Sequence, residues 1–245
     1  MQHYFKKSEI HNNFQLYSWE YIVFNEFETM LTSKARLFPC IFGIAGFLLD
    51  QLRYSFNERM TASEIAPALE HFVKHSREYG QKTSLVIFSR PSPVEDITRY
   101  EKRFWSLLSE LALIDKHNWP EQIPPTMDDP LWEFCFAGEP IFVVCNTPAH
   151  VLRQSRRASS FMLTFQPRWV FEEILGTPES AKRSLDKVRT RLKLFDLIPH
   201  SPHLGLYGNP QNREYAQYFL RENNNKVSCP FHQLTYPSSK NKDVA

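Results

Sequence analysis

Residues 131–145 read LWEFCFAGEPIFVVC, in which two apolar runs, 131–136 and 140–145, are joined by the triplet AGE. Both runs are rich in aromatic and β-branched side chains, which favour strands, and a short link containing glycine is typical of a hairpin. Two more apolar runs have the same character, at 83–89 (TSLVIFS) and 161–165 (FMLTF). The sequence therefore predicts a sheet whose strands pair mainly in the antiparallel sense.

Helix signals alternate with these strands along the chain. Residues 14–32 carry apolar side chains at helical spacing. Capping residues predict three further helices, from Thr61 to Gly80, from Ser92 to about Leu113, and from Thr177 to about Phe195. We therefore expect an α+β fold, an α/β sandwich with helices packed on one mainly antiparallel sheet. A single domain is expected over residues 1–238, followed by a disordered polar tail at 239–245.

Composition argues against several classes of protein. The 245 residues include only 7 glycines, and neither G-x-G-x-x-G nor G-x-x-x-x-G-K-[ST], the common phosphate-binding patterns, occurs. A net charge of +2 is too small to predict a nucleic-acid partner. No apolar run approaches the length of a membrane span, so no membrane partner is expected. Four cysteines without any C-x-x-C spacing favour a reducing, cytoplasmic compartment.

The densest polar cluster lies between two predicted strands, where NTPAHVLRQSRR occupies residues 146–157. His150 is followed there by Arg153, Arg156 and Arg157. Arginine side chains suit carboxylates and phosphates, and a neutral imidazole is a common axial ligand of haem iron. The cluster therefore predicts a site for an anion, or for an anionic cofactor that carries a metal. The alternative is a solvated turn whose arginines pair with neighbouring acids.

Cysteine marks two other candidate sites. Cys40 follows Phe38-Pro39, where the proline bends the chain. The thiol at this bend is a candidate metal ligand, or a candidate nucleophile if positive groups lower its pKa. The alternative is an inert thiol among aromatic side chains. Cys229 and His232 fit either a shared metal or a segment that docks the C-terminus. Docking is preferred because no second pair has the spacing of a zinc site.

Taken in order, several motifs resemble those of the YqcI/YcgG family over residues 14–233. They are FPCIFG at 38–43, the hairpin at 132–144, PAH at 148–150 with Arg153 and Ser155-Arg156 after it, FQPRWVF at 165–171, and CPF at 229–231. Some relatives in this superfamily are haem-dependent N-oxygenases of guanitoxin and D-cycloserine biosynthesis. The chain departs from them where Phe42-Gly43 replaces Gly-Ala, and where the segment ending at His150 replaces His-Pro.

The resemblance implies a haem site and an assignment of roles around it. His150 would be the proximal iron ligand with Cys40 as the alternative, because thiolate ligation favours O–O cleavage. The cofactor-binding set would be Cys40 and His150 together with the propionate partners Arg153, Arg156 and Arg157. A guanidinium substrate would need a carboxylate partner, and the candidates are Asp128, Asp129 and Glu133. Electrons would come from a separate reductase or from peroxide.

Three hypotheses follow from these residues. The leading one is a cytoplasmic haem-dependent oxygenase, an enzyme that hydroxylates a guanidine or amine nitrogen of a small arginine-like substrate. The second is a non-catalytic haem- or anion-binding protein, a sensor or carrier that uses the same basic pocket. The third is a metal-free interaction protein whose motifs serve folding alone.

Overall fold

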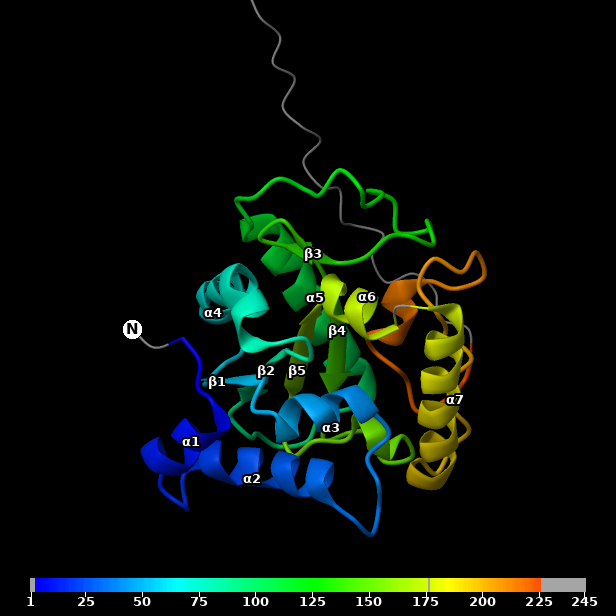
Figure 1. The fold of residues 1–245 in the computed structure, drawn as a ribbon. Helices are drawn as coiled ribbons and strands as arrows, with labels where there is room; N and C mark the ends of the chain where they lie inside the picture. Colours follow the sequence, from blue (N-terminus) through cyan, green and yellow to red (C-terminus); the bar gives the residue numbers. More distant parts are fainter. Residues whose placement is uncertain (1–2, 176, 226–245) are drawn as a thin grey trace, which may run out of the picture.

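A five-stranded sheet runs through the described residues, 3–175 and 177–225, of the computed structural model (Figure 1). The strands are β1 (Arg53–Asn57), β2 (Leu85–Ser89), β3 (Cys135–Phe136), β4 (Glu139–Asn146) and β5 (Met162–Pro167). Their order is β1-β2-β5-β4-β3. β1 pairs with β2 in parallel, while β2–β5, β5–β4 and β4–β3 are antiparallel. The predicted mainly antiparallel sheet is confirmed.

The hairpin predicted at 131–145 forms between β3 and β4. Phe136 pairs with Glu139 across the turn, and the two residues between them have positive φ, 54° at Ala137 and 74° at Gly138. Positive φ at both central residues is the geometry that matches the right-handed twist of a hairpin, and glycine adopts it without strain. The strand pairing is shorter than the apolar pattern suggests, because only Cys135 and Phe136 of the first run belong to β3.

Helices surround the sheet. They are α1 (Lys7–Asn13), α2 (Trp19–Thr32), α3 (Ile41–Leu48), α4 (Ala62–His75), α5 (Ile97–Ile114), α6 (Arg168–Leu175) and α7 (Pro178–Phe195), with short 3-10 turns η1 (Ser76–Tyr79), η2 (Gln154–Arg156) and η3 (Glu214–Gln217). The capping box of α4 is confirmed, because Thr61 and Glu64 each accept a backbone hydrogen bond from the other. Thr177 likewise caps α7 by accepting from the N–H of Ser180.

Two predicted helix starts were wrong. The helix expected from Ser92 begins at Ile97, because Asp96 accepts a 2.7 Å hydrogen bond from the Thr98 N–H and caps the helix there. The helix expected over 14–32 begins at Trp19, because Ser18 is its capping residue. In both cases the helix starts at a capping residue that is closer to the apolar residues of the helix than the predicted start was.

Four elements, α1, α3, α6 and β1, were not predicted from the sequence. At α3, Pro39 was expected only to end a helix, whereas it precedes Cys40, which caps the new helix. β1 escaped notice because Arg53 and Ser55 interrupt its apolar pattern, although four of its five residues are buried. β1 is the parallel neighbour of β2 and makes the sheet a mixed one.

The two faces of the sheet are covered by different helices (Figure 1). On one face, α4 and α5 pack over Leu85, Ile87 and Phe165. On the other face, α1, α2 and α3 cover β1 and β2, while α7 stands to one side.

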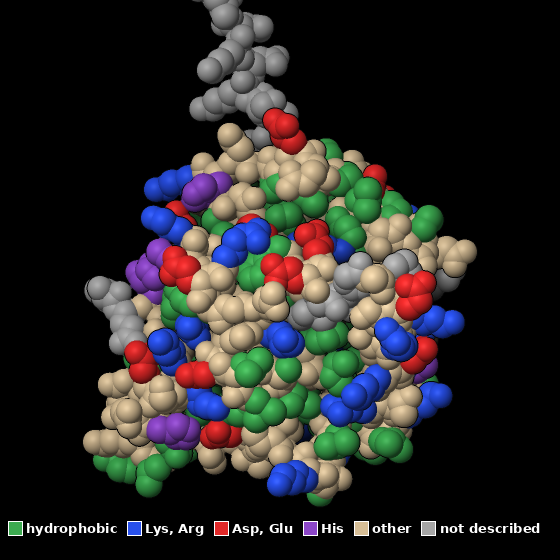
Figure 2. Space-filling model, viewed as in Figure 1, with side chains coloured by type: hydrophobic (Ala, Val, Ile, Leu, Met, Phe, Trp, Pro, Cys, Tyr) green, Lys and Arg blue, Asp and Glu red, His purple; other side chains and the backbone are tan. Residues whose placement is uncertain are grey.

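Hydrophobic side chains also gather on the outer surface around α3, where Leu48 and Leu49 are exposed (Figure 2). The described residues form a single α+β domain, and none of their helices is both long enough and apolar enough to span a bilayer.

Candidate active site

A cavity of about 310 Å³ lies between the sheet and the helices α3 and α7. It occupies the face of β4 and β5 that α4 and α5 do not cover. Along these strands Ile141, Val143 and Phe165 are fully buried, whereas the alternate residues are only partly buried. Those alternate residues, which line the cavity, are Phe142, Val144, Thr164 and Gln166. The volume and the largely apolar walls are those of small-molecule and cofactor sites.

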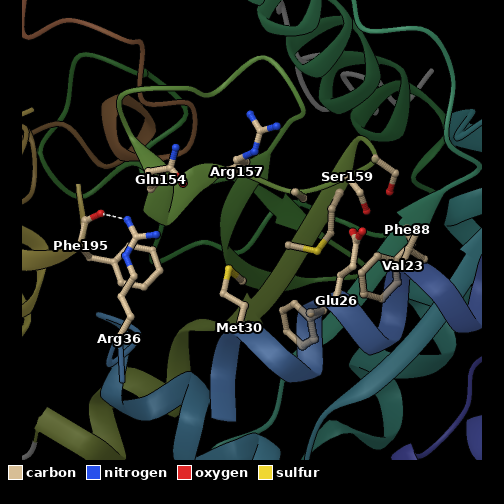
Figure 3. A pocket seen from close by; sticks show the side chains of 13 residues that line it. Val23, Glu26, Met30, Arg36, Phe88, Gln154, Arg157, Ser159 and Phe195 are labelled. Atoms are coloured by element: carbon tan, nitrogen blue, oxygen red, sulfur yellow. Dashed lines mark hydrogen bonds between the residues drawn. The ribbon is translucent and has the colours of Figure 1, made fainter. Parts of the chain in front are cut away.

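Figure 3 shows a second cavity, of about 320 Å³. Phe27, Met30 and Met162 line both cavities, so the two are neighbours. The second cavity is more polar, and its walls include Glu26 and Arg157. It therefore suits an apolar cofactor less well than the main cavity does.

Cys40 lines the main cavity at the start of α3. Its Sγ accepts a 3.2 Å hydrogen bond from the backbone N–H of Gly43. The side chain has exposed surface, yet it is surrounded by protein. The thiol thus lies on the cavity wall and keeps solvent-accessible surface.

The protonation of Cys40 is governed by this position. Burial raises the pKa of the thiol above its ordinary value, while the N–H groups of Gly43 and Phe42 and the charges of Arg156 and Arg191 act in the opposite direction. The thiol form is therefore favoured at neutral pH in the protein by itself. A metal cation in the cavity would reverse this balance, because a coordinating thiol loses its proton.

Arg153 and Arg156 also line the main cavity and are buried. Arg153 donates to the carbonyl of Arg221 and to the side chain of Asn224, and Arg156 donates to the carbonyl of Gln217. The Nη1 atoms of both arginines have no hydrogen-bond partner among the described residues. Burial lowers the pKa of both, that of Arg156 to about 10, so both remain cationic at neutral pH. The cavity thus has two buried cations with unused donors.

His150 does not line either cavity. Its Nε2 lies 2.8 Å from the carbonyl oxygen of Leu220, which can only accept, so Nε2 carries the proton. Its Nδ1 lies 2.9 Å from the hydroxyl of Thr147 and therefore accepts from it. Burial lowers the pKa of His150 to about 4, which keeps the ring neutral. Both ring nitrogens are thus engaged in holding the 147–157 segment, and neither has a lone pair free for a metal.

The other predicted site residues separate into different regions. Arg157 donates to the carbonyls of Pro148 and His150 and lines only the second cavity. Asp128 is exposed, and Asp129 accepts from the N–H of Leu131 in the loop before the hairpin. Cys229 lies outside the described residues, as does the tail at 239–245. Only Cys40, Arg153 and Arg156 of the predicted set meet at the main cavity.

A buried group of acidic side chains also lies beside the main cavity. Arg168, the first residue of α6, lies between Glu133 and Glu214, with Nη1 at 3.7 Å and 3.5 Å from their carboxylate oxygens. Arg168, Glu214 and Tyr207 line the cavity, whereas Glu133 does not. The Arg168 guanidinium stacks on the ring of Tyr207. Glu133 was a candidate site residue from the sequence, whereas Glu214 was not, because the segment around η3 contains no recognisable sequence motif.

The chain is similar to known proteins over most of its length. The model of the YqcI/YcgG family matches residues 27–232. The chain is 44% identical to YqcI of Bacillus subtilis (strain 168), covering 88% of this chain and 89% of that protein. It is 42% identical to YcgG of the same strain, over 93% and 94% respectively. The chain belongs to the YqcI/YcgG family. No solved structure matches it.

A third relative carries a biochemical name. The Streptomyces lavendulae protein named "Putative N(omega)-hydroxy-L-arginine synthase DcsA" is 30% identical over 88% of this chain and 85% of its own length. Two motifs of this YqcI/YcgG chain meet at the main cavity, since FPCIFG supplies Cys40 and the 146–157 segment supplies Arg153 and Arg156. A third motif, FQPRWVF, supplies Gln166, Arg168 and Phe171 to the same walls. Family motifs that are far apart in sequence therefore converge on one cavity.

Proposed function

We propose that this protein is a haem-dependent oxygenase that hydroxylates a guanidine or amine nitrogen of a small, arginine-like substrate. The observation that carries the proposal is the position of Cys40. Its thiol lies on the wall of a largely apolar cavity that the buried arginines Arg153 and Arg156 also line. The name of the DcsA relative supports the choice of nitrogen hydroxylation on an arginine-like molecule.

The residues on the cavity walls fit a haem in three respects. Haem iron needs one protein ligand, and Cys40 offers a sulfur held by the first turn of α3. The two anionic propionates would pair with the guanidinium groups of Arg153 and Arg156. Phe42, Phe142 and Phe171 would contact the faces of the ring.

This assignment reverses the order of preference that we drew from the sequence. His150 is expected there to hold the iron, with Cys40 as the alternative. Because both nitrogens of His150 are hydrogen-bonded, we now propose Cys40 as the ligand and His150 as a residue that positions the arginine segment. Arg157 is left out of the proposed haem site, since it lines only the second cavity.

The chemistry divides between the cofactor and the chain. When bound, haem with a thiolate ligand supports reductive cleavage of O₂. In the overall reaction one oxygen atom enters the N–O bond and the other leaves as water, so two electrons and two protons are required. We propose a separate reductase as the electron donor. The chain's own residues bind the cofactor, exclude water from the apolar cavity, and orient the substrate nitrogen.

The cellular setting in this proposal is the cytoplasm. The described cysteines, Cys40, Cys135 and Cys145, are free thiols. Free thiols persist in the reducing cytoplasm, where a reductase and small amino-acid substrates are also present.

The proposed activity is tested with purified protein loaded with hemin and supplied with L-arginine, a flavoprotein reductase system and ¹⁸O₂. We expect a product that contains one ¹⁸O atom on nitrogen, formed at a rate that falls to background without hemin. A matched reaction with hemin-loaded Cys40→Ala separates the protein's activity from that of free hemin. Formation of no oxygenated product from L-arginine or its close homologues contradicts the enzymatic proposal.

The second candidate is a haem- or anion-binding sensor or carrier. The two buried arginines on the cavity wall, Arg153 and Arg156, favour it, because they would bind an anion whether or not a reaction follows. Stable hemin binding and binding of carbon monoxide to the reduced protein, without consumption of any arginine-like substrate, would favour this candidate over the enzyme.

A further inference from the structure

The acidic cluster of Glu133, Arg168 and Glu214 is under-satisfied in the folded chain. The Glu133 side chain is fully buried, and neither of its oxygens has a hydrogen-bond partner among the described residues. Glu214 is 5% exposed and accepts one hydrogen bond, from the side chain of Gln217. The Nε of Arg168 has no partner in the described chain either. Two buried carboxylates therefore share one guanidinium at distances longer than a hydrogen bond.

This arrangement leaves an excess of negative charge at the cavity wall. With both carboxylates ionised, the cluster carries one uncompensated negative charge in a low-dielectric setting, which is costly. Glu139 and Glu172 lie near enough to Glu133 to add to the negative potential, and Arg77 acts mainly on Glu139. Either a bound proton or a second cation would balance the cluster. Since Glu214 lines the cavity, a ligand there can supply that cation.

The chemistry of the cluster limits the kind of cation. A planar guanidinium or a primary ammonium offers several N–H donors to carboxylate oxygens, and a carboxylate can accept from two guanidinium groups at once. Tyr207 stacks on Arg168 and adds an aromatic surface next to the position of a second planar cation. Arg153 and Arg156 line the same cavity, and the carboxylate of Asp196 lies near both of them on its wall. The cavity therefore carries charges of both signs, and Glu214 with Arg168 forms one group of them.

We infer that Glu214, held against Arg168 and backed by Glu133, is the residue that selects a cationic nitrogen group in the substrate of this cavity. The inference rests on the proposed function, whose substrate carries such a group. To the proposed function it adds a specificity-determining residue, Glu214, which was not predicted from the sequence. In this arrangement Glu214 contacts the guanidinium or ammonium group directly. Glu133 acts through Arg168 and is a positioning residue.

The test compares L-arginine with L-citrulline, which has the same length but an uncharged ureido group. Isothermal titration calorimetry of the purified protein, with and without hemin, measures both ligands without any need for turnover. A charge-assisted hydrogen bond contributes about 1.5–3 kcal/mol, so L-arginine is expected to bind roughly 10–100-fold more tightly than L-citrulline. Glu214→Gln should weaken L-arginine binding by the same factor and leave L-citrulline binding unchanged.

Two further variants keep the test decisive. Glu101→Gln is the matched control, because Glu101 is also a buried carboxylate paired with an arginine, Arg221, but does not line the cavity. It should leave both affinities unchanged. If Glu214→Gln does not fold, Glu214→Asp keeps the charge with a shorter reach, and should weaken L-arginine binding while keeping the preference over L-citrulline.

The outcomes separate this inference from the proposed function. Selective L-arginine binding that depends on Glu214, without product formation, supports the subsite and contradicts the oxygenase. Product formation with equal L-arginine affinity and unchanged KM in wild type and Glu214→Gln overturns the subsite and leaves the oxygenase standing. Equal binding of the two ligands to the wild type, or no binding of L-arginine, also overturns the subsite.

Discussion

The backbone N–H of Gly43 donates a 3.2 Å hydrogen bond to Sγ of Cys40 across the first turn of α3. This contact fixes the thiol at the wall of the main cavity, in the position from which a ligand bond to a cofactor would start. It also makes the space beside Cys40 tight, because a Cβ added at Gly43 would lie 3.3 Å from that sulfur.

Gly43→Ala should therefore perturb the proposed ligand without unfolding the chain. The added methyl group pushes on Sγ, so we expect hemin affinity to fall several-fold and the Soret band to broaden. Titration of hemin into both proteins measures this. Gly138→Ala is the control, since nothing lies within 4 Å of its added Cβ. The positive φ at this position makes alanine less stable there by about 1 kcal/mol, but the position is far from the cavity. Equal hemin affinity in Gly43→Ala and wild type would contradict the account of this contact.

Arg156→Met tests the proposed partner of a propionate. Loss of one charge-assisted hydrogen bond, worth about 1.5–3 kcal/mol, should weaken hemin binding roughly 10–100-fold. The stability of the protein without hemin should also fall, because the substitution removes the donor to the buried carbonyl of Gln217. Arg157→Met should bind hemin as the wild type does, since Arg157 lines only the second cavity. An equal loss of affinity in the two variants would count against the assigned propionate site.

His150 should make the protein sensitive to acid. Its pKa falls from an ordinary value of 6.5 to about 4 in the folded state because of burial. The unfolded chain therefore takes up a proton first as the pH falls, and this group costs about 3 kcal/mol of stability between pH 6.5 and pH 4. His150→Gln, which has no titrating ring, should show a shallower decline over that range. Urea unfolding at a series of pH values measures the difference, and parallel curves would show that His150 is not the group responsible.

Glu214 should have the opposite effect on the pH dependence. Burial raises its pKa to about 7, although Arg168 partly counters the rise. The groups that surround it are Arg168, Glu133, Tyr207 and Gln217. Because the unfolded carboxyl loses its proton first, stability from this group is complete below pH 4.5 and is lost as the pH rises through 7, by about 3 kcal/mol. Burial also raises the pKa of Glu133, which remains in the variant. Urea unfolding should therefore show a shallower loss in Glu214→Gln than in the wild type, and the same decline in both would refute the prediction.

The strands and long helices could be predicted because their signals are local. The hairpin at 131–145 follows from alternating apolar residues around a glycine turn, and α4 follows from its capping box. α3 and β1 could not be predicted in this way. Their stability depends on contacts between distant segments, such as the pairing of Arg53–Asn57 with Leu85–Ser89.

The site was predictable only in part for a similar reason. The sequence placed Arg153 and Arg156 beside His150, but not the direction in which each side chain points. In the structure the arginines face the cavity, while His150 is turned toward Thr147 and Leu220. Glu214 had no local signal, because its role arises from a contact with Arg168, 46 residues earlier in the chain.

The most direct test of the central claim is the absorption spectrum of the hemin-loaded, reduced protein with carbon monoxide. The account predicts a red-shifted Soret band typical of thiolate ligation in the wild type, and its loss in Cys40→Ala. Cys145→Ala, which removes a buried cysteine on the opposite face of the sheet, should keep the band. The absence of a Soret band in the wild type, or an unchanged band in Cys40→Ala together with its loss in His150→Ala, would contradict the assignment of Cys40 as the haem ligand.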